Sequence, residues 1–314
     1  MSTARFRGEA AWAYAFIAPP FLGFFAFALG PMIASLVLSF THYDVLSPPK
    51  SVGLENYRDL FTSDYFVGRT LINTAFYMLG VPIGMAVALL IAMLLDRIVH
   101  LRGFFRTVYF VPSVCSIVAL ALLWKLIYRG DYGLLNTLLV RLGIHDPPSW
   151  LSDPRLVKPS LVFMGIWTNL GYTSVVFLAA LQGVPRQHLE AAELDGANAW
   201  QRLVHVTLPS MSPVILFAVV TGIIEALQYV TQGYVAGTVA GGGDSGVGSG
   251  SSLGYPEGST LFYPVWLYQQ GFQYFNMGYA SAMAVGLFVV ALAVTVVVLR
   301  SARHWVAGVE GAGG

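Results

Sequence analysis

Six long apolar segments recur along this 314-residue chain, and they restrict its possible folds more than any other feature. A helix needs roughly 20 apolar residues to cross the hydrocarbon of a bilayer, and each segment is long enough to do so. Hydrophobic residues make up 56% of the chain and charged residues only 11%, a balance that does not suit a soluble surface. The sequence therefore predicts a membrane protein with spans at about 12–40, 70–95, 107–128, 158–183, 210–232 and 274–299.

These spans are expected to be helices. Within lipid, only helices and closed barrels satisfy every backbone N–H and C=O group. Barrel strands would alternate polar and apolar residues over about ten positions, and the sequence lacks that alternation. The first segment is too long for a signal peptide and has no evident small-residue cleavage site, so we expect it to be retained. We predict an all-α, polytopic protein with six transmembrane helices in a single domain, residues 1–314.

The orientation follows from the loops that carry Arg. Those around Arg5, Arg102, Arg186 and Arg300 are shorter than the loops on the opposite side, so their density of positive charge is higher. Cytoplasmic loops carry the excess of Lys and Arg in membrane proteins. Both termini and the 184–209 loop are therefore expected in the cytoplasm. The net charge of +1 gives no indication of a nucleic-acid partner.

Polar residues inside the spans are candidates for a solute pathway, because each is costly in lipid and normally faces a partner or water. In the fifth span they are spaced 4, 3 and 4 apart, which predicts one helical face. The set is Asn73 and Tyr77 in the second span, Asn169 and Thr173 in the fourth, and Thr221, Glu225, Gln228 and Gln232 in the fifth.

Two interpretations of these polar residues stay open. Single Asn and Thr side chains often hold a helix bundle together through hydrogen bonds between helices. For the stripe that includes Glu225 we favour a hydrated cavity. Neutral amides and hydroxyls dominate the set, which suits a polyhydroxylated solute better than an ion.

The 184–209 loop is unusually polar and long for a connection between two spans. Pro185 favours a helix start, residues 186–194 are good helix formers, and Asp195-Gly196 interrupts the run. Helical pattern resumes at Ala197, and Pro209 and Pro213 are expected to end it. We predict two short helices bent at a glycine, with small residues that allow a partner to approach closely.

Other motifs do not support catalysis or metal binding. The Gly/Ser-rich stretch at 241–252 lacks the Gly-Lys-Ser/Thr of a phosphate-binding loop, and its "GDSG" offers a serine without a triad. The six histidines are scattered and show no metal-ligand spacing.

The stretch "EAAELDGANAWQRLVHVTLPSMSP" closely resembles the EAA loop of binding-protein-dependent ABC transporter permeases. The stretches "SFTHYDVLSPPKSVGLENYRDLF", "LRGFFRTVYFVPSV", "GDYGLLNTLL", "PSWLSDP" and "FNMGYASAMAVGLF" are similar to carbohydrate-uptake permeases of the maltose and glycerol-3-phosphate type. The resemblance covers nearly the whole chain, with several motifs in the same order.

The resemblance implies a type I ABC importer permease in the bacterial inner membrane. Such a subunit imports a sugar together with a second, homologous permease, two ATP-binding subunits and an extracytoplasmic solute-binding protein. ATP and Mg are used by the ATP-binding subunits, so this chain is expected to hold no cofactor and to be no enzyme. The 184–209 loop would be the coupling helix that docks on the ATPase. The residues so implied are Glu190, Ala191, Ala192, Asp195, Gly196 and Ala197.

One departure concerns the solute. Family members commonly carry an aromatic-Asp pair and a short Gly-Gly-Gly-Pro turn after the fifth span, where this chain has Val230-Thr231 and a longer Gly-rich loop. A non-sugar solute, such as a glycerophosphodiester or a sugar phosphate, is the first alternative, although an anionic solute would favour Arg or Lys deep in the spans and none is present. An ion-coupled secondary transporter would show inverted repeats and broken helices, which the sequence does not reveal. An intramembrane enzyme would need a nucleophile paired with a base, and the sequence shows no such pair.

Overall fold

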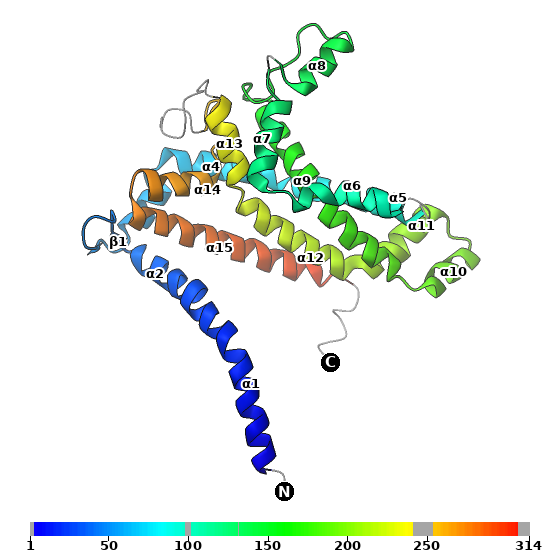
Figure 1. Ribbon diagram of the computed structural model, residues 1–314, viewed down its shortest axis with the longest axis horizontal. Helices are drawn as coiled ribbons and strands as arrows, with labels where there is room; N and C mark the ends of the chain where they lie inside the picture. The colour runs from blue at the N-terminus through cyan, green and yellow to red at the C-terminus, as the bar shows by residue number, and fades with distance from the viewer. Residues whose placement is uncertain (1–2, 98–101, 131, 241–253, 307–314) are drawn as a thin grey trace. The chain divides into compact units, whose positions relative to one another are not determined.

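The computed structural model describes residues 3–97, 102–130, 132–240 and 254–306, so the Gly/Ser-rich stretch 241–252 lies outside the described residues. The chain divides into two compact units. The first comprises residues 1–65 and 267–289, and the second comprises 66–266 and 290–314. Helices dominate both (Figure 1), which confirms the predicted all-α class.

In the first unit, a continuous helical segment is built from α1 (Thr3–Phe24), the π-helix η1 (Phe25–Leu29) and α2 (Gly30–Leu38). A short antiparallel hairpin, β1 (Thr41–His42) with β2 (Lys50–Ser51), leads to α3 (Glu55–Thr62). The side-chain amide of Asn56 in α3 donates to the carbonyl oxygens of Ser39 and Thr41, at 2.9 Å each. These bonds hold α3 against the connection between α2 and β1. The π-helix η3 (Gln269–Gln273) precedes α15 (Met277–Ala302), whose later residues belong to the second unit.

The second unit holds the remaining helices. In chain order they are α4 (Tyr65–Met78), α5 (Gly80–Arg97), α6 (Arg102–Val114), α7 (Ile117–Ile127), α8 (Leu134–Arg141), α9 (Val157–Gln182), α10 (Arg186–Leu194), α11 (Ala199–Arg202), the π-helix η2 (Leu203–Thr207), α12 (Leu208–Leu227), α13 (Thr231–Ala240) and α14 (Tyr263–Tyr268). The first residue of α4 and the last two of α14 fall in the first unit.

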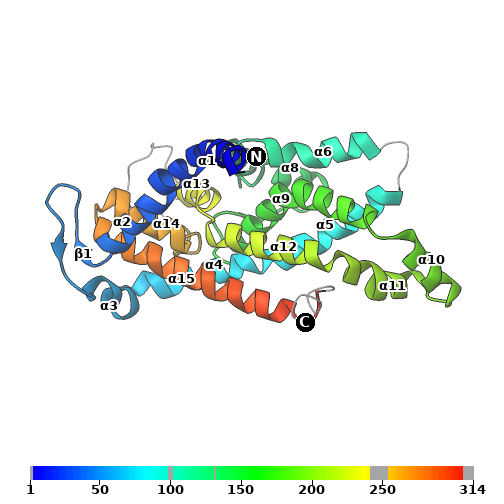
Figure 2. The same cartoon turned by 90° about the horizontal axis from the view of Figure 1, so that it is seen from below.

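The core of the second unit lies where α5, α9 and α12 run side by side (Figures 1 and 2). Ala88 and Ala92 of α5 are fully buried against Phe177 of α9 and Met211 of α12. Small residues at such positions let helix backbones approach closely, which is how helices associate in an apolar medium. This packing fixes three of the helices that line the cavity described below.

Five helical segments of the described chain are long and apolar enough to cross a membrane. They are Tyr14–Leu38, Tyr65–Arg97, Val157–Gln182, Ala199–Gly237 and Met277–Ala302. A sixth span results if Gly103–Val114 and Ile117–Ile127, bent by 101° to each other, are counted together. The structure thus gives the predicted multi-span helical architecture, with different limits for several spans.

The third predicted span, 107–128, is not one straight helix. Pro112 lacks the N–H that a continuous helix needs, and α6 ends at Val114. Ser116 is extended (ψ 129°) and its carbonyl accepts the first bond of α7, from the N–H of Leu120, at 3.0 Å. The sequence signal for this bend was Pro112 followed by Ser113 and Ser116.

Pro209 and Pro213 do not end a helix, in contrast to the prediction. The chain stays helical from Ala199 through η2 into α12, with Pro209 at its N-terminal turn and Pro213 inside it. A proline at 213 leaves the carbonyl of Pro209 without its usual N–H donor, and the Ser212 hydroxyl donates to that carbonyl at 2.6 Å instead. The substitute bond allows the helix to continue.

We expect Gly171→Ala to destabilise the protein by about 1–3 kcal/mol, because overpacking a close helix contact costs that much. A Cβ at Gly171 of α9 would overlap the backbone carbonyl oxygen of Tyr109 in α6, and a backbone atom cannot rotate away. Gly103→Ala in α6 is the matched control, since no atom lies within 4 Å of that position. Thermal unfolding in detergent should show a lower midpoint for Gly171→Ala alone, and equal midpoints for the two variants would contradict the contact.

Candidate functional site: an exposed loop and a polar cavity

The 184–209 loop folds as two short helices, α10 and α11, joined by a turn at Asp195–Asn198. Gly196 lies at the bend with φ +80°, a conformation that residues with a side chain rarely adopt. The N–H of Ala197 donates to the carbonyl of Ala192 at 2.9 Å across this bend. The predicted pair of helices bent at a glycine is therefore present in the structure.

Local contacts fix the shape of this loop. The side chain of Asn198 accepts from the N–H of Gln201 at 2.9 Å, and the Gln201 side chain accepts from the N–H of Asn198 at 2.8 Å. This reciprocal pair caps α11. Arg202 then forms an ion pair with Glu193 at 2.6 Å and holds α11 against α10. The loop is thus a preformed surface feature.

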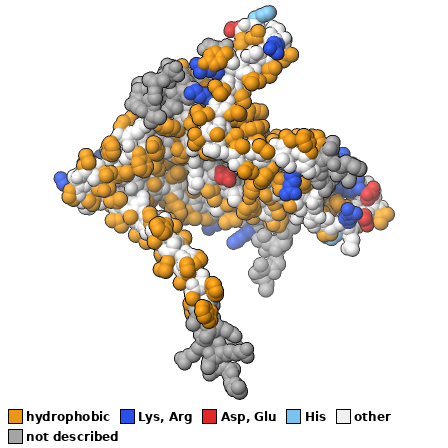
Figure 3. Space-filling model, viewed as in Figure 1, with side chains coloured by type: hydrophobic (Ala, Val, Ile, Leu, Met, Phe, Trp, Pro, Cys, Tyr) orange, Lys and Arg blue, Asp and Glu red, His pale blue; other side chains and the backbone are white. Residues whose placement is uncertain are grey.

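The residues that the sequence singled out in this loop face outward or are partly covered. Glu190, Ala191, Asp195 and Gly196 are exposed, while Ala192 and Ala197 are half-buried. Two large apolar side chains of the loop, which were not among the predicted residues, are also exposed. The exposed fraction is 90% for Leu194 and 70% for Trp200. Large apolar groups at such exposure suit contact with another protein. Figure 3 shows charged side chains gathered at the α10–α11 end of an otherwise largely hydrophobic surface.

A cavity of about 390 Å³ lies in the second unit between α4, α5, α9, α12 and the α12–α13 connection. Most of the predicted pathway residues line it. They are Tyr77, Asn169, Thr173, Thr221, Glu225, Gln228 and Gln232. The structure therefore brings together residues that are separated by up to 155 positions in the chain.

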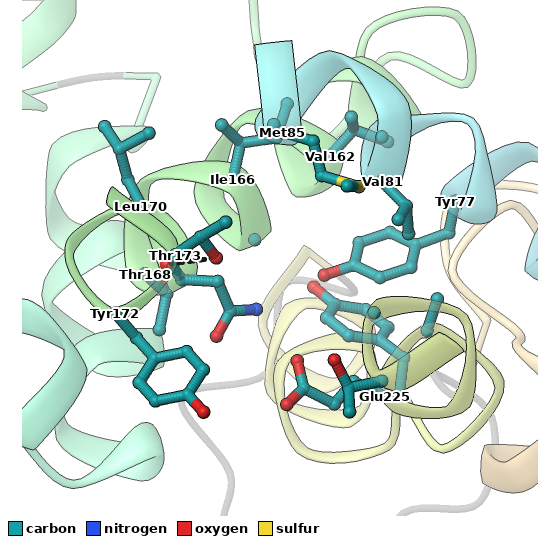
Figure 4. Close-up of a pocket in the computed structure, with 18 of the residues that line it drawn as sticks. Tyr77, Val81, Met85, Val162, Ile166, Thr168, Leu170, Tyr172, Thr173 and Glu225 are labelled. Atoms are coloured by element: carbon teal, nitrogen blue, oxygen red, sulfur yellow. Dashed lines mark hydrogen bonds between the residues drawn. The ribbon is translucent and has the colours of Figure 1, made fainter. Parts of the chain in front are cut away.

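Polar groups reach the cavity from opposite walls. Figure 4 shows Tyr172 of α9 and Glu225 of α12 facing the same open space, with Tyr77 of α4 at another edge. Glu225, Gln228 and Asn169 are exposed to this space although they lie within apolar spans. Polar side chains in a span that remain accessible from a cavity can bind a solute.

The stripe in the fifth span is not one continuous helical face. The helix α12 ends at Leu227, and α13 begins at Thr231. Between them, the buried Tyr229 ring stacks on Tyr77, with ring centroids 3.8 Å apart, and meets Phe262 edge-on at 5.0 Å. This aromatic contact accompanies the break, yet Gln228 and Gln232 still line the cavity.

The set predicted from the sequence lacks four hydroxyl-bearing residues of the cavity wall, namely Thr168, Tyr172, Tyr229 and Thr231. A signal existed for the first two, because Thr168 and Tyr172 have the same i, i+4 spacing as Asn169 and Thr173 and lie one residue before them. Tyr229 lies in the break between α12 and α13, and Thr231 is the first residue of α13. No local sequence pattern predicted this break.

Asn73 is a packing residue in this structure and does not line the cavity. It is 1% exposed, and its amide donates to the carbonyls of Gly258 and Leu261 at 2.8 Å each. Its neighbour Thr74 accepts from the N–H of Tyr263 at 3.1 Å. Together they fasten the 258–263 segment to α4, so the hydrogen-bonding role that stayed open for single Asn residues applies here.

We expect Asn73→Ala to lower the free energy of unfolding by about 2–4 kcal/mol, because two buried carbonyls lose their donor. The matched variant is Asn169→Ala, which removes the same atoms from an exposed position on the cavity wall. Thermal unfolding midpoints should fall for Asn73→Ala and stay unchanged for Asn169→Ala. Equal midpoints would show that Asn73 does not hold the segment.

Comparison with known proteins identifies the family. Residues 80–306 match the family model described as "Binding-protein-dependent transport system inner membrane component". This chain belongs to that family. It is 37% identical over 295 residues to the probable ABC transporter permease protein YesP of Bacillus subtilis (strain 168), an alignment that covers 93% of this chain and 91% of the relative.

Two further relatives carry names that specify a solute. The arabinooligosaccharides transport system permease protein AraP of Bacillus subtilis (strain 168) is 31% identical, over 94% of this chain and 90% of the relative. The lactose transport system permease protein LacF of Rhizobium radiobacter is 33% identical, over 90% of this chain and 89% of the relative. The chain is therefore an ABC transporter permease, a multi-pass membrane subunit of a transport system.

A solved structure shares the fold. The crystal structure of a bacterial alginate ABC transporter, in complex with an alginate pentasaccharide-bound periplasmic protein, contains a chain that matches with a TM-score of 0.78 and 22% identity. The match covers 97% of this chain and 98% of the other. The fold is thus that of a type I ABC importer permease, as the sequence resemblance implied.

Proposed function

We propose that this chain is the permease subunit of an ATP-driven importer that passes a sugar into the cytoplasm through the cavity between α4, α9 and α12. The observation that carries the proposal is the composition of that cavity. Amide groups of Asn169, Gln228 and Gln232 and the hydroxyl group of Tyr172 line one space within apolar spans. Such groups match the hydroxyls of a saccharide, and the named solutes of the relatives AraP and LacF are saccharides.

The proposal includes the partners that the resemblance implied. A second homologous permease completes the pathway as a heterodimer, and a solute-binding protein delivers the sugar from outside. Two ATP-binding subunits hydrolyse ATP with Mg, and this chain itself holds no cofactor and catalyses no reaction. The description of the family as a binding-protein-dependent system supports this assembly.

The α10–α11 loop is the proposed contact with an ATP-binding subunit. Its preformed bend at Gly196, its ion pair between Glu193 and Arg202, and its exposed Leu194 and Trp200 support that role. In this proposal, the loop and both termini face the cytoplasm of a bacterial cell, and closure of the ATP-binding subunits moves the loop and turns the cavity outward.

The test has two stages. Thermal-shift screening of the cognate binding protein against neutral and acidic sugars, glycerophosphodiesters and sugar phosphates identifies the solute. Uptake of that solute is then measured in proteoliposomes that contain the whole transporter. We expect Gln228→Ala and Glu225→Ala each to raise KM about tenfold, because each removes a hydrogen-bonding group worth about 1–2 kcal/mol.

Gln182→Ala serves as the control for these variants, since Gln182 is an exposed glutamine at the end of α9 outside the cavity. Unchanged kinetics for both cavity variants would reject the cavity as the solute route. A binding protein that takes only non-sugar solutes would reject the sugar as substrate and leave the permease assignment standing.

A further inference from the structure

The charge of the cavity wall is one-sided. Among the described residues that line the cavity, Glu225 is the only acidic side chain, and none is Lys, Arg or His. The rest of the wall consists of amides, hydroxyls, glycines and apolar side chains such as Val81, Val162 and Ile166. The cavity therefore offers a negative potential with no fixed cation to balance it.

Glu225 is also uncompensated by its neighbours. In the part of the chain that the structure describes, its carboxylate makes no hydrogen bond or ion pair, and it is exposed to the cavity. The low-dielectric walls of a protein cavity focus the field of a charge, so the field of Glu225 extends across the space to the α9 wall, where Tyr172 lies (Figure 4).

From these two observations we infer that Glu225 is a specificity-determining residue that restricts transport to sugars without a carboxylate. The inference rests on the proposed function and adds the substrate class, namely neutral mono- or oligosaccharides. A neutral sugar exchanges its water for the amides and hydroxyls of the wall at little electrostatic cost. A uronic acid would bring a second carboxylate beside Glu225 into a space without a counterion, and like charges in such a site repel strongly.

The chain allows a direct test of this field, because Cys115 is its single cysteine. In a Cys115→Ser background, Asn169→Cys places a thiol on the α9 side of the cavity that Glu225 lines from α12. The assembled transporter is treated with two methanethiosulfonate reagents of similar size, one carrying a trimethylammonium group and one a sulfonate. The ratio of their reaction rates with this thiol reports the local potential, because any effect of Glu225 on thiol ionisation changes both rates equally.

We expect the cationic reagent to be favoured, and Glu225→Gln to lower the rate ratio about tenfold, the size expected for one unit charge a short distance away in a poorly screened site. Asp146→Asn is the matched control: it also removes one carboxylate, but from an exposed residue outside the cavity, and it should leave the ratio unchanged. A ratio that does not respond to Glu225→Gln would overturn the inference.

The sugar itself provides the second arm. The binding-protein screen described above includes acidic sugars, and uptake by the wild type and by Glu225→Gln is compared for the sugar it identifies. A neutral sugar as the transported substrate supports the inference. Efficient uptake of a uronate by the wild type overturns it while the proposed import of a sugar stands. The absence of any sugar uptake would contradict the proposed function, and the rate ratio would still report the charge of the cavity.

Discussion

Replacing Gly196 by valine is expected to reduce ATP-dependent uptake at least tenfold while the permease still inserts into the membrane. Gly196 has φ +80°, and a β-branched side chain is strained in that conformation by roughly 1–2 kcal/mol or more. The space around the missing Cβ is open, so the effect comes from the backbone and not from a clash. The bend between α10 and α11 would change, and the proposed ATPase contact would no longer fit.

Two matched variants separate docking from strain. Gly143 also has a positive φ, +94°, and open space around its Cβ, but it lies outside the loop, so Gly143→Val imposes similar strain without touching the ATPase contact. Gly196→Asn keeps the bend, because asparagine tolerates the left-handed conformation. Co-purification of the ATP-binding subunits should fail for Gly196→Val alone. Normal co-purification and uptake with that variant would refute the proposed role of the loop.

The second large effect is expected at Thr221. Thr221→Trp places a large ring in a cavity of about 390 Å³ and should abolish uptake by occupying the space that the sugar needs. Because α12 is held in the core by residues such as Met211, ten positions before Thr221, the protein should still assemble with the ATP-binding subunits.

Thr221→Val is the control at the same position. Valine has nearly the same size as threonine. The Thr221 hydroxyl already donates to backbone carbonyls of α12, those of Phe217 at 2.9 Å and Ala218 at 3.2 Å. Uptake by Thr221→Val should therefore remain within about threefold of the wild type, since an internal bond of this kind contributes little. Uptake by Thr221→Trp at the wild-type rate would show that the solute does not pass through this cavity.

The multi-span helical architecture was predictable because long apolar segments leave no alternative in lipid. The bend of the 184–209 loop was predictable as well, since glycine after aspartate marks a left-handed turn. The π-helix at Leu203–Thr207 and the passage of the helix through Pro213 were not, because they depend on bonds such as that from Ser212 to the Pro209 carbonyl. Such replacement hydrogen bonds are found only in the three-dimensional structure.

The cavity was predictable in part. Spacing on α9 and α12 indicated which side chains share a face, and most of them do converge. The spacing of polar residues could not show that Asn73 is buried while Asn169 lines the cavity. Asn73 is buried because its amide donates to the carbonyls of Gly258 and Leu261, which lie nearly 190 residues further along the chain. The spacing also could not place Tyr229, whose position results from stacking on Tyr77 across the helix break.

The most direct test of the account is the energy source of transport. The assembled transporter, with its binding protein and the sugar that this protein selects, is placed in proteoliposomes, and sugar accumulation is measured with ATP, without ATP, and with an imposed proton or sodium gradient alone. We expect accumulation that requires ATP and the binding protein and that is lost in Thr221→Trp. Accumulation driven by an ion gradient without ATP would contradict it.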